Sequence, residues 1–445
     1  MPMTAAEQYM LELINRARLD PLAEAARYGS DLNQGLAPGT ITASAKQVLA
    51  PNAALDQAAE AHSLWMLNTD TFSHTGAGGS TAGDRMAAAG YVFTGTWSWA
   101  ENLHWYGTTG ALNLEAVIGL QHQGLFESAS HRVNTFAPQM REIGIAQVGG
   151  QFTSGGVTYN ASMVTQNFAL SGATVFVTGV AYTDRNADAF YGIGEGLGGI
   201  TITAAGNAST TAAAGGYSVG VAAGSAVTVN VAQGATALAS LTLDMAAGNG
   251  KLDVLSNGAG GWSLALSTSA TLISGIANAT LLGVANLNLT GSSAANTLGG
   301  NKGNNVINGK GGADHIAGGA GNDILIGGYG RDVLDAGVGA DEFYYRSTFE
   351  STGRRGDQIT NFEHGVDHIN LAAIDSNPFV AGNQAFSFIG AAGFGGLGAA
   401  SAGQLRLVNT AGHSVIQIDT DGNGVANMQI LATTTAALTL GDFIL

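Results

Sequence analysis

The chain has 445 residues, a formal net charge of −16 and no cysteine. Its length indicates several domains, its acidity excludes attraction to nucleic acid or anionic membranes through charge, and it has no disulfides to stabilise an extracellular fold. Glycine contributes 67 residues and charged residues only 11% of the chain, a composition that favours turn-rich β structure.

The first segment, residues 1–171, is predicted as an α+β domain. Thr4 and Glu7 form a capping box ahead of apolar residues spaced as on one helix face, up to Pro21. These residues lack a signal-peptide h-region, and no run of about 18 apolar residues occurs, so we expect neither a cleaved signal peptide nor a membrane-spanning helix. Further helices are expected near Asn52, at about 81–90 and at about 112–125, and strands at 142–148 and 158–170.

From residue 172 onward, the sequence pattern is typical of β-strands. Residues 172–234 are predicted as a small β-sandwich, because short β-branched runs alternate with glycine-rich turns. Residues 235–290 are interpreted as an irregular β ladder that leads into the repeats. The strands expected in the sandwich are 174–178, 200–203 and 227–231.

An acidic loop within the predicted sandwich has the spacing of an EF-hand calcium loop. Positions 1, 3, 5, 7 and 12 are Asp184, Asn186, Asp188, the Phe190 carbonyl and Glu195. Position 6 is Ala189, where an EF-hand has glycine. The loop resembles the calcium-binding β-sandwich repeats of bacterial surface proteins, which implies a bound calcium ion; a solvated acidic turn is the alternative.

Six nine-residue repeats occupy residues 291–344 and follow the template Gly-Gly-x-Gly-x-Asp-x-apolar-x. A glycine-rich linker does not explain why polar and apolar residues recur in this fixed register. The sixth positions are Asn296, Asn305, Asp314, Asp323, Asp332 and Asp341, and the eighth positions are Leu298, Ile307, Ile316, Leu325, Leu334 and Phe343.

This spacing predicts a calcium-binding β-roll. Glycine permits a tight turn whose carbonyls point inward, and the apolar residue begins a short strand that faces the core. Two repeats complete one coil, so Asp314 stacks on Asp332 and Asp323 on Asp341, with calcium between them. Asn296 and Asn305 offer a neutral carbonyl only, and we expect weaker sites there.

The repeat array resembles the RTX (repeats-in-toxin) family. The resemblance implies calcium binding, export by a type I secretion ABC transporter, and an extracellular or cell-surface location. Residues 345–445 are predicted as a C-terminal β-domain, in which Asp357, Ile359, Asp367 and Ile369 look like strands that close the roll. The last four residues, 442–445, resemble the uncleaved secretion signal of such proteins.

Four motifs of residues 1–171 resemble the CAP superfamily, the fold of cysteine-rich secretory and plant pathogenesis-related proteins. The resemblance implies an α-β-α sandwich with a central antiparallel sheet, so the whole chain is predicted as multidomain, α+β and then β. The motifs are Phe72-Ser73-His74-Thr75, Asp84-Arg85-Met86 leading to Gly90-Tyr91, Ala100-Glu101-Asn102-Leu103, and Ser128-Ala129-Ser130-His131-Arg132.

The CAP resemblance also implies a shallow cleft in which two histidines and two glutamates hold a divalent metal such as zinc. By motif, His74, Glu101 and His131 take three of these places. The fourth is open, because the usual Trp-centred segment is replaced by residues 121–127; Glu127 is our candidate, with His122 behind it. The alternative is that these side chains only hydrogen-bond the core together.

These features favour a secreted calcium-binding protein whose CAP domain is a metal- or ligand-binding head. No cysteine nucleophile is present, so catalysis has no direct support. Two alternatives stay open. One is a metal-dependent hydrolase with Glu101 as general base beside a metal held by His74 and His131, and the other is a structural or adhesive surface protein. The sequence does not identify the extracellular ligand.

Overall fold

The computed structural model describes residues 2–224, 226–353, 356–410, 412–434 and 436–445. It forms two compact units, Met1–Thr268 and Ser269–Leu445, and each is considered by itself. Within the described ranges, no helix is long and apolar enough to cross a membrane.

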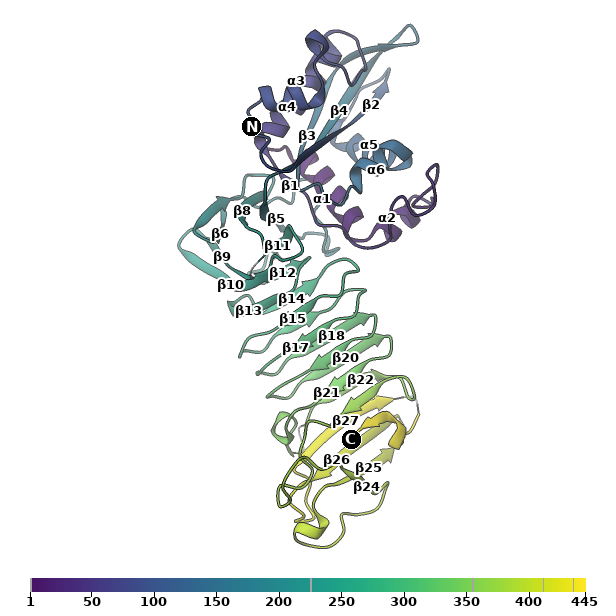
Figure 1. Cartoon of the computed structure of the whole chain (residues 1–445), viewed down its shortest axis with the longest axis vertical. Helices are drawn as coiled ribbons and strands as arrows, with labels where there is room; N and C mark the ends of the chain where they lie inside the picture. Colours follow the sequence, from purple (N-terminus) through teal and green to yellow (C-terminus); the bar gives the residue numbers. More distant parts are fainter. Residues whose placement is uncertain (1, 225, 354–355, 411, 435) are drawn as a thin grey trace. The chain divides into compact units, whose positions relative to one another are not determined.

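The first part of the N-terminal unit is a four-stranded sheet in the order β1-β3-β4-β2, with helices on both faces (Figure 1). Strands β2, β3 and β4 are antiparallel, and β1 pairs parallel with β3. The strands are β1 (Ala50–Pro51), β2 (Trp97–Thr108), β3 (Glu142–Ser154) and β4 (Val157–Ser171). The helices are α1 (Ala5–Leu19), α2 (Pro21–Arg27), α3 (Ala53–Asn68), α4 (Ala82–Ala88), α5 (Leu114–Glu127) and α6 (Ala129–Thr135), with a 3-10 turn at Ala77–Gly79.

Local sequence signals account for these helices. Thr4 caps α1 in the predicted capping box, Asn52 caps α3, and Thr81 forms a second capping box with Asp84 at the start of α4. The predicted helices and strands of this part are confirmed. Strand β2, which carries Glu101, was not predicted from the sequence.

The sheet is buried on both faces because successive residues of β4 point to opposite sides. Val164 and Phe168 pack in one core cluster with Met10 of α1 and Ile118 of α5. On the other face, Ala169 belongs to a cluster with Leu55 of α3 and Met86 of α4, and Met163 to a third cluster with Met66 of α3. This two-sided packing fixes the positions of α3 and α4 and of the residues between them.

The second part of the N-terminal unit consists of strands in two groups, β12-β11-β5-β8 and β10-β9-β6-β7. Within the segment 235–290, β10 pairs with β9 and β11 with β5 of the preceding segment, and β12 pairs with β11. A buried ion pair joins the two parts of the unit, because Lys251 of β11 reaches Glu12 of α1 at 2.8 Å. The strands are β5 (Thr174–Thr183), β6 (Ile200–Ala204), β7 (Asn207–Thr210), β8 (Gly216–Ala222), β9 (Ala226–Gln233), β10 (Thr236–Asp244), β11 (Gly250–Ser256) and β12 (Trp262–Leu266).

The C-terminal unit is a roll of two parallel ladders, visible as successive coils in Figure 1. Leu298 pairs with Ile316 and Ile316 with Leu334, so equivalent residues recur one coil later, eighteen positions along the chain. All the eighth-position residues of the repeats are buried. The prediction that two repeats form one coil is confirmed.

One ladder follows the order β13-β15-β17-β19-β21-β23-β28 and the other β14-β16-β18-β20-β22-β27. Strands β25, β26 and β27 pair antiparallel, so the segment after the repeats extends the second ladder into an ordinary sheet. The strands are β13 (Ala270–Gly275), β14 (Asn278–Leu281), β15 (Asn288–Thr290), β16 (Thr297–Gly299), β17 (Val306–Asn308), β18 (His315–Ala320), β19 (Ile324–Ile326), β20 (Val333–Val338), β21 (Glu342–Tyr344), β22 (Gln358–Phe362), β23 (His368–Asn370), β24 (Ser387–Phe388), β25 (Gln404–Thr410), β26 (His413–Asp419), β27 (Met428–Thr434) and β28 (Phe443–Ile444). Short 3-10 turns lie at Thr348–Glu350, Ala399–Ser401 and Leu440–Asp442.

Candidate functional site

The sixth-position aspartates of the roll form two continuous side-chain ladders. Oδ1 of Asp332 accepts the backbone N–H of Asp314 at 2.8 Å, and Oδ1 of Asp341 accepts that of Asp323 at 2.7 Å. The second oxygen, Oδ2, is buried in each of these four aspartates and has no hydrogen-bond partner among the described residues. One oxygen of each carboxylate is therefore structural, and the other is left for a ligand.

Glycine keeps open the space that these oxygens face. A Cβ atom built on Gly318 would collide with Oδ2 of Asp323 and with the carbonyl oxygen of Ala336. The same holds on the other ladder, where a Cβ on Gly309 would collide with Oδ2 of Asp314. Carboxylate and carbonyl oxygens thus converge on one point, and hard oxygen donors of this kind suit calcium.

Burial also raises the pKa of these carboxyls, to about 7 for Asp314 and Asp341 and to about 6 for Asp323 and Asp332. The cause is loss of solvation, which the hydrogen bond to Oδ1 only partly offsets. Keeping these carboxylates ionised in the folded roll therefore costs free energy, and a bound cation would remove that cost.

Two further aspartates that the sequence analysis did not assign as ligands continue the ladders. Oδ1 of Asp357 accepts the N–H of Asp332 at 2.9 Å, and Oδ1 of Asp367 accepts the N–H of Asp341 at 3.0 Å. Burial raises the pKa of Asp357 to about 8. Both follow the repeats after loops of irregular length, but both keep the Asp-x-Ile pattern of Asp314, which is the signal that identifies them.

The asparagines of the first two repeats place a neutral amide oxygen where the later repeats have Oδ2 of an aspartate, because Oδ1 of Asn296 lies beside Gly291 and Oδ1 of Asn305 beside Gly300. Nδ2 of Asn305 donates to the carbonyl oxygen of Leu287 at 3.0 Å, and Nδ2 of Asn296 donates to that of Ala277 at 3.2 Å. The amide nitrogen thus takes the place of the aspartate Oδ1 that faces the preceding coil. The amide oxygen accepts the backbone N–H of Ser292 in one repeat and of Asn301 in the next, at 2.7 and 2.9 Å, so it is already satisfied and carries no charge.

The acidic loop at residues 184–195 directs its carboxylates to its own backbone. The carboxylate of Asp184 accepts the N–H groups of Asp188 and Ala189 at 3.2 and 3.1 Å. That of Glu195 accepts the N–H groups of Arg185 and Gly192 at 3.1 and 2.7 Å. Ala189 has φ +55°, the left-handed conformation for which an EF-hand uses glycine at position 6. The loop has the EF-hand backbone turn, and calcium binding there stays a prediction.

The CAP-like cleft is organised around Glu101 of β2. Its Oε1 accepts a hydrogen bond from Nδ1 of His74 at 2.8 Å, and its Oε2 pairs with the guanidinium of Arg85 at 2.5 Å. Glu101 is buried, whereas 61% of the His74 side chain is exposed. The buried carboxylate therefore orients an exposed imidazole and neutralises the arginine behind it.

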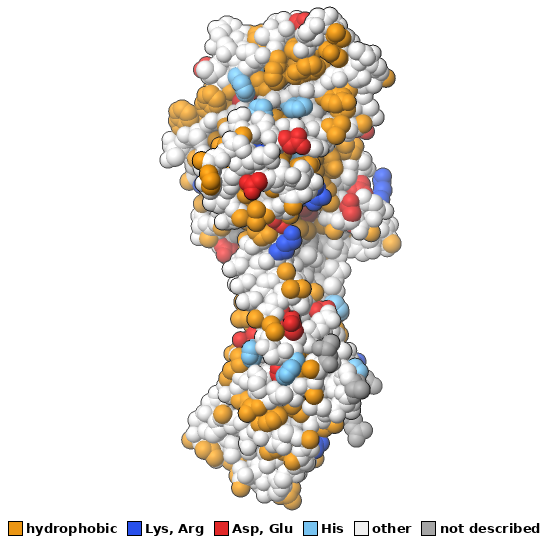
Figure 2. Space-filling model, turned by 90° about the vertical axis from the view of Figure 1, so that its right-hand side faces the viewer, with side chains coloured by type: hydrophobic (Ala, Val, Ile, Leu, Met, Phe, Trp, Pro, Cys, Tyr) orange, Lys and Arg blue, Asp and Glu red, His pale blue; other side chains and the backbone are white. Residues whose placement is uncertain are grey.

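Two more histidines lie near this group. Burial lowers the pKa of His131, and electrostatic interaction with His74 lowers it further; burial and the interaction with His131 lower the pKa of His104 in the same way. Nδ1 of His131 and Nδ1 of His104 are both buried without a partner in the described part of the chain. Figure 2 shows histidine side chains gathered on one face of this unit, beside hydrophobic surface.

His104 was missed because the CAP motifs do not include it and β2 was not predicted. Its signal is Gly124 of α5, where a Cβ would collide with the closely approaching ring atoms of His104. Glycine destabilises a helix interior relative to alanine. A glycine at such a position therefore indicates that another group packs too close to leave room for a Cβ.

The two candidates for the fourth cleft position are engaged elsewhere. Glu127 is exposed and accepts a hydrogen bond from Gln123 at 2.7 Å. His122 is buried, donates to Glu24 at 3.1 Å and contacts the ring of Tyr28. Over the described ranges, no group of three or more His, Cys, Asp or Glu side chains is arranged to hold a metal ion. Zinc in this cleft therefore stays a prediction.

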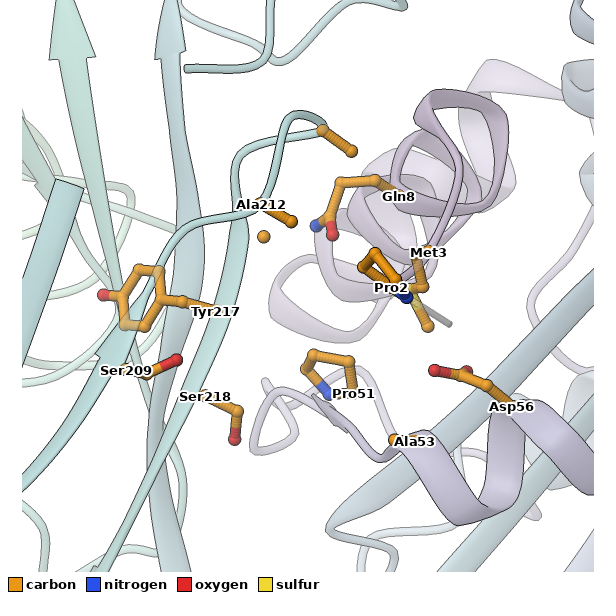
Figure 3. A pocket seen from close by; sticks show the side chains of 12 residues that line it. Pro2, Met3, Gln8, Pro51, Ala53, Asp56, Ser209, Ala212, Tyr217 and Ser218 are labelled. Atoms are coloured by element: carbon orange, nitrogen blue, oxygen red, sulfur yellow. The ribbon is translucent and has the colours of Figure 1, made fainter. Parts of the chain in front are cut away.

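A separate cavity of about 310 Å³ lies between the two parts of the N-terminal unit (Figure 3). Gln8 of α1, Tyr217 of β8 and Asp56 of α3 line it. Asp56 accepts the N–H of Ile145 at 2.9 Å, and burial raises its pKa to about 7, with Glu7 and Glu60 adding to the effect. The charge at this junction therefore changes near neutral pH.

Comparison with known proteins gives two family matches. Residues 11–168 match the cysteine-rich secretory protein family (CAP), and residues 284–445 match the C-terminal region of serralysin, a peptidase of family M10. A search of curated proteins found no match.

Several solved structures share local similarity with the chain. The AlgE6R3 subunit of the Azotobacter vinelandii mannuronan C5-epimerase is 25% identical over 35% of this chain and 76% of that one, with a TM-score of 0.23. An extracellular protein containing an SCP domain, from Bacillus anthracis, is 21% identical over 37% of this chain and 39% of that one, with a TM-score of 0.22. The two family matches show that the chain joins a CAP domain to a serralysin-type, RTX calcium-binding repeat region.

Proposed function

We propose that this chain is a calcium-stabilised protein, exported by a type I secretion ABC transporter, whose CAP domain binds an extracellular ligand. One observation carries the proposal: the buried Oδ2 atoms of the roll aspartates have no hydrogen-bond donor among the residues described. A divalent cation between successive coils would supply the missing partner.

Calcium fits this role because of where it is abundant. Extracellular calcium modules bind with Kd values of about 10⁻⁴ to 10⁻³ M, so low cytosolic calcium leaves them empty. In the empty roll the stacked carboxylates repel one another, and the glycine-rich turns lose much backbone entropy on ordering. The chain would then stay unfolded during export and fold after it meets calcium outside the cell.

The CAP cleft is the second candidate site, and its chemistry favours binding. The imidazole of His74 is exposed, and its Nδ1 donates a hydrogen bond to the buried carboxylate of Glu101. This carboxylate–histidine pair is the arrangement that orients metal-binding imidazoles, and it is the observation in favour of the metal-dependent hydrolase. Glu101 is, however, already paired with Arg85, so we derive no hydrolytic step from it.

The test for the roll is hydrogen exchange of the full-length protein with and without calcium. At pH 8 we expect protection of residues 306–370 only when calcium is present, and protection of the CAP domain in both states. Equal protection of the roll after chelation would contradict the proposal. Co-expression with and without a type I transporter tests export, and metal analysis of the secreted protein tests zinc.

A further inference from the structure

The cavity between the two parts of the N-terminal unit is large enough, at about 310 Å³, for a small organic molecule (Figure 3). Helices α1 and α3 and strand β1 form one side of it, and strands β7 and β8 form the other. The apolar part of its lining includes Met3, Pro51 and the ring of Tyr217, and the polar part includes Gln8 and Asp56. The cavity thus combines an apolar wall with a few polar groups.

Asp56 of α3 offers one carboxylate oxygen to the cavity. Its Oδ1 accepts the backbone N–H of Ile145 at 2.9 Å, whereas Oδ2 makes no hydrogen bond or ion pair with the residues that the structure describes. Oδ2 is not among the buried, unpartnered atoms of the described chain, so a ligand can reach it. Figure 3 shows the carboxylate pointing into the open space. The backbone therefore holds one oxygen in place and leaves the other for a ligand.

Gln8 of α1 supplies a second acceptor, although the residue is only 2% exposed. Its Nε2 donates to Glu12 at 2.8 Å, which fixes the orientation of the amide. Its Oε1 accepts no hydrogen bond from the described residues and, like Oδ2 of Asp56, is not sealed from solvent. A Cβ atom on Gly216 of β8 would collide with this Oε1, so glycine leaves room for the amide at the cavity wall.

Charge narrows the class of ligand. Asp56 is the one charged side chain among the described residues that line the cavity, and none of them is lysine or arginine. A smaller cavity of about 170 Å³ shares Asp56 and adds Glu7 and Glu60, and both glutamates raise the pKa of Asp56. Their negative charge therefore acts at the same place. An anion would be repelled there, whereas a cation would stabilise the partly buried carboxylate.

We propose that this cavity is a binding site for a small organic ammonium ion with a short apolar body and a hydrogen-bond donor at its other end. The ammonium group pairs with Oδ2 of Asp56, the apolar body lies against Pro51 and Tyr217, and the second donor reaches Oε1 of Gln8. The site is separate from the cleft around Glu101 and from the calcium-binding roll, so it goes beyond the function proposed above.

The test is calorimetry and saturation-transfer NMR on the calcium-loaded, full-length protein at pH 8, where Asp56 is ionised. The probe is aminohexanol, a flexible chain with an amine at one end and a hydroxyl at the other. Hexanediol and hydroxyhexanoate replace the ammonium group by a neutral and by an anionic group, and hexylamine lacks the hydroxyl. We expect aminohexanol to bind at least about tenfold more tightly than hexanediol, since a hydrogen bond to a charged group is worth about that factor. Hexylamine should bind more weakly than aminohexanol, and hydroxyhexanoate most weakly of all.

Three variants locate the binding. Asp56→Asn keeps an acceptor for the N–H of Ile145 but removes the charge, so aminohexanol should bind it no more tightly than hexanediol does. Glu60→Gln removes the same charge one turn further along α3, outside the lining of the larger cavity, and should have a much smaller effect. Ala53→Phe fills the cavity from an exposed position at the start of α3 and should abolish binding.

Three results would overturn the proposal. They are absence of aminohexanol binding to the native protein, equal binding of hexanediol, and unchanged binding in Asp56→Asn or Ala53→Phe. None of them bears on calcium binding by the roll, so the proposed function would stand if this inference failed.

Discussion

The backbone N–H of Asn305 donates to Oδ1 of Asp323 at 2.7 Å, so the sixth positions of two successive coils are joined side chain to backbone. Asn305 sends its own Nδ2 back to Leu287 at 3.0 Å, whereas Oδ2 of Asp323 has no partner within the described ranges. The atom of Asn305 that is equivalent to Oδ2 of Asp323 is its Oδ1, which accepts the N–H of Asn301 at 2.9 Å, so this place is satisfied in one coil and left open in the next. We expect the asparagine coils to form before the aspartate coils bind calcium.

Asp323→Ala should raise the calcium concentration at the folding midpoint of the roll, because it removes a ligand from a central coil. Each site filled at ten times its Kd adds about 1.4 kcal/mol to stability, so loss of one site among several coupled sites is measurable. Asn296→Ala should move the midpoint less, since it removes only an amide hydrogen bond. Circular dichroism of the full-length protein during a calcium titration measures both midpoints.

Asp323→Asn provides the matched control for that experiment. Its Nδ2 can donate to the preceding coil as Asn305 does, so the metal-free roll should gain protection while the calcium dependence of this coil decreases. Equal shifts in all three variants would show that the coils are not graded in this way.

Glu101→Gln should destabilise the CAP domain by about 3 kcal/mol, because it leaves the largely buried guanidinium of Arg85 without its anion. His74→Ala removes an exposed ring and should cost less than about 1 kcal/mol. Urea unfolding monitored by tryptophan fluorescence gives both values. A cost for Glu101→Gln as small as that for His74→Ala would mean that this pair contributes little to the fold.

Local capping signals and a periodic repeat explain why much of the fold could be predicted. The capping boxes at Thr4 and Thr81 locate helices through local hydrogen bonds, and the nine-residue period of the repeats fixes the register of the roll. Asp357 and Asp367 escaped assignment as ligands because they follow loops that break the period. Their role becomes visible only when the ladder places them above Asp332 and Asp341.

The cleft was harder to predict because it depends on packing between distant segments. Motifs identified His74 and Glu101, which contact each other, but no motif indicates that Arg85 takes the second oxygen of Glu101. His104 comes from a strand with no clean alternation of polar and apolar residues. Where a side chain points toward another element, sequence spacing alone does not reveal the partner.

Ala189→Gly should stabilise the loop at residues 184–195. Ala189 has φ +55°, which costs a residue with a Cβ about 1–2 kcal/mol, and glycine regains this at an entropic cost of about 0.4–1 kcal/mol in the unfolded chain. The net gain is between about 0 and about 1.6 kcal/mol, measured as added hydrogen-exchange protection of the loop. Ala212→Gly, at an alanine without positive φ, should be neutral or destabilising. A loss of protection in Ala189→Gly would contradict the expected relief of strain.

The metal-free roll should become more stable as the pH falls. Burial raises the pKa of Asp357 to about 8 and those of Asp314 and Asp341 to about 7, whereas an unfolded aspartate has a pKa of about 3.9. Between these values the folded roll binds more protons than the unfolded chain. The free energy of unfolding therefore rises as the pH falls from about 8 to about 4 and then levels off.

Hydrogen exchange in the presence of a chelator, with rates corrected for their intrinsic pH dependence, should show more protection of the roll at pH 5 than at pH 8. Calcium should reverse this order, because it binds the ionised carboxylates and protons compete with it. The double variant Asp314→Asn, Asp341→Asn removes two of the titrating groups and should flatten the metal-free pH dependence. A metal-free roll that is equally unprotected at both pH values would mean that protons do not substitute for the cation.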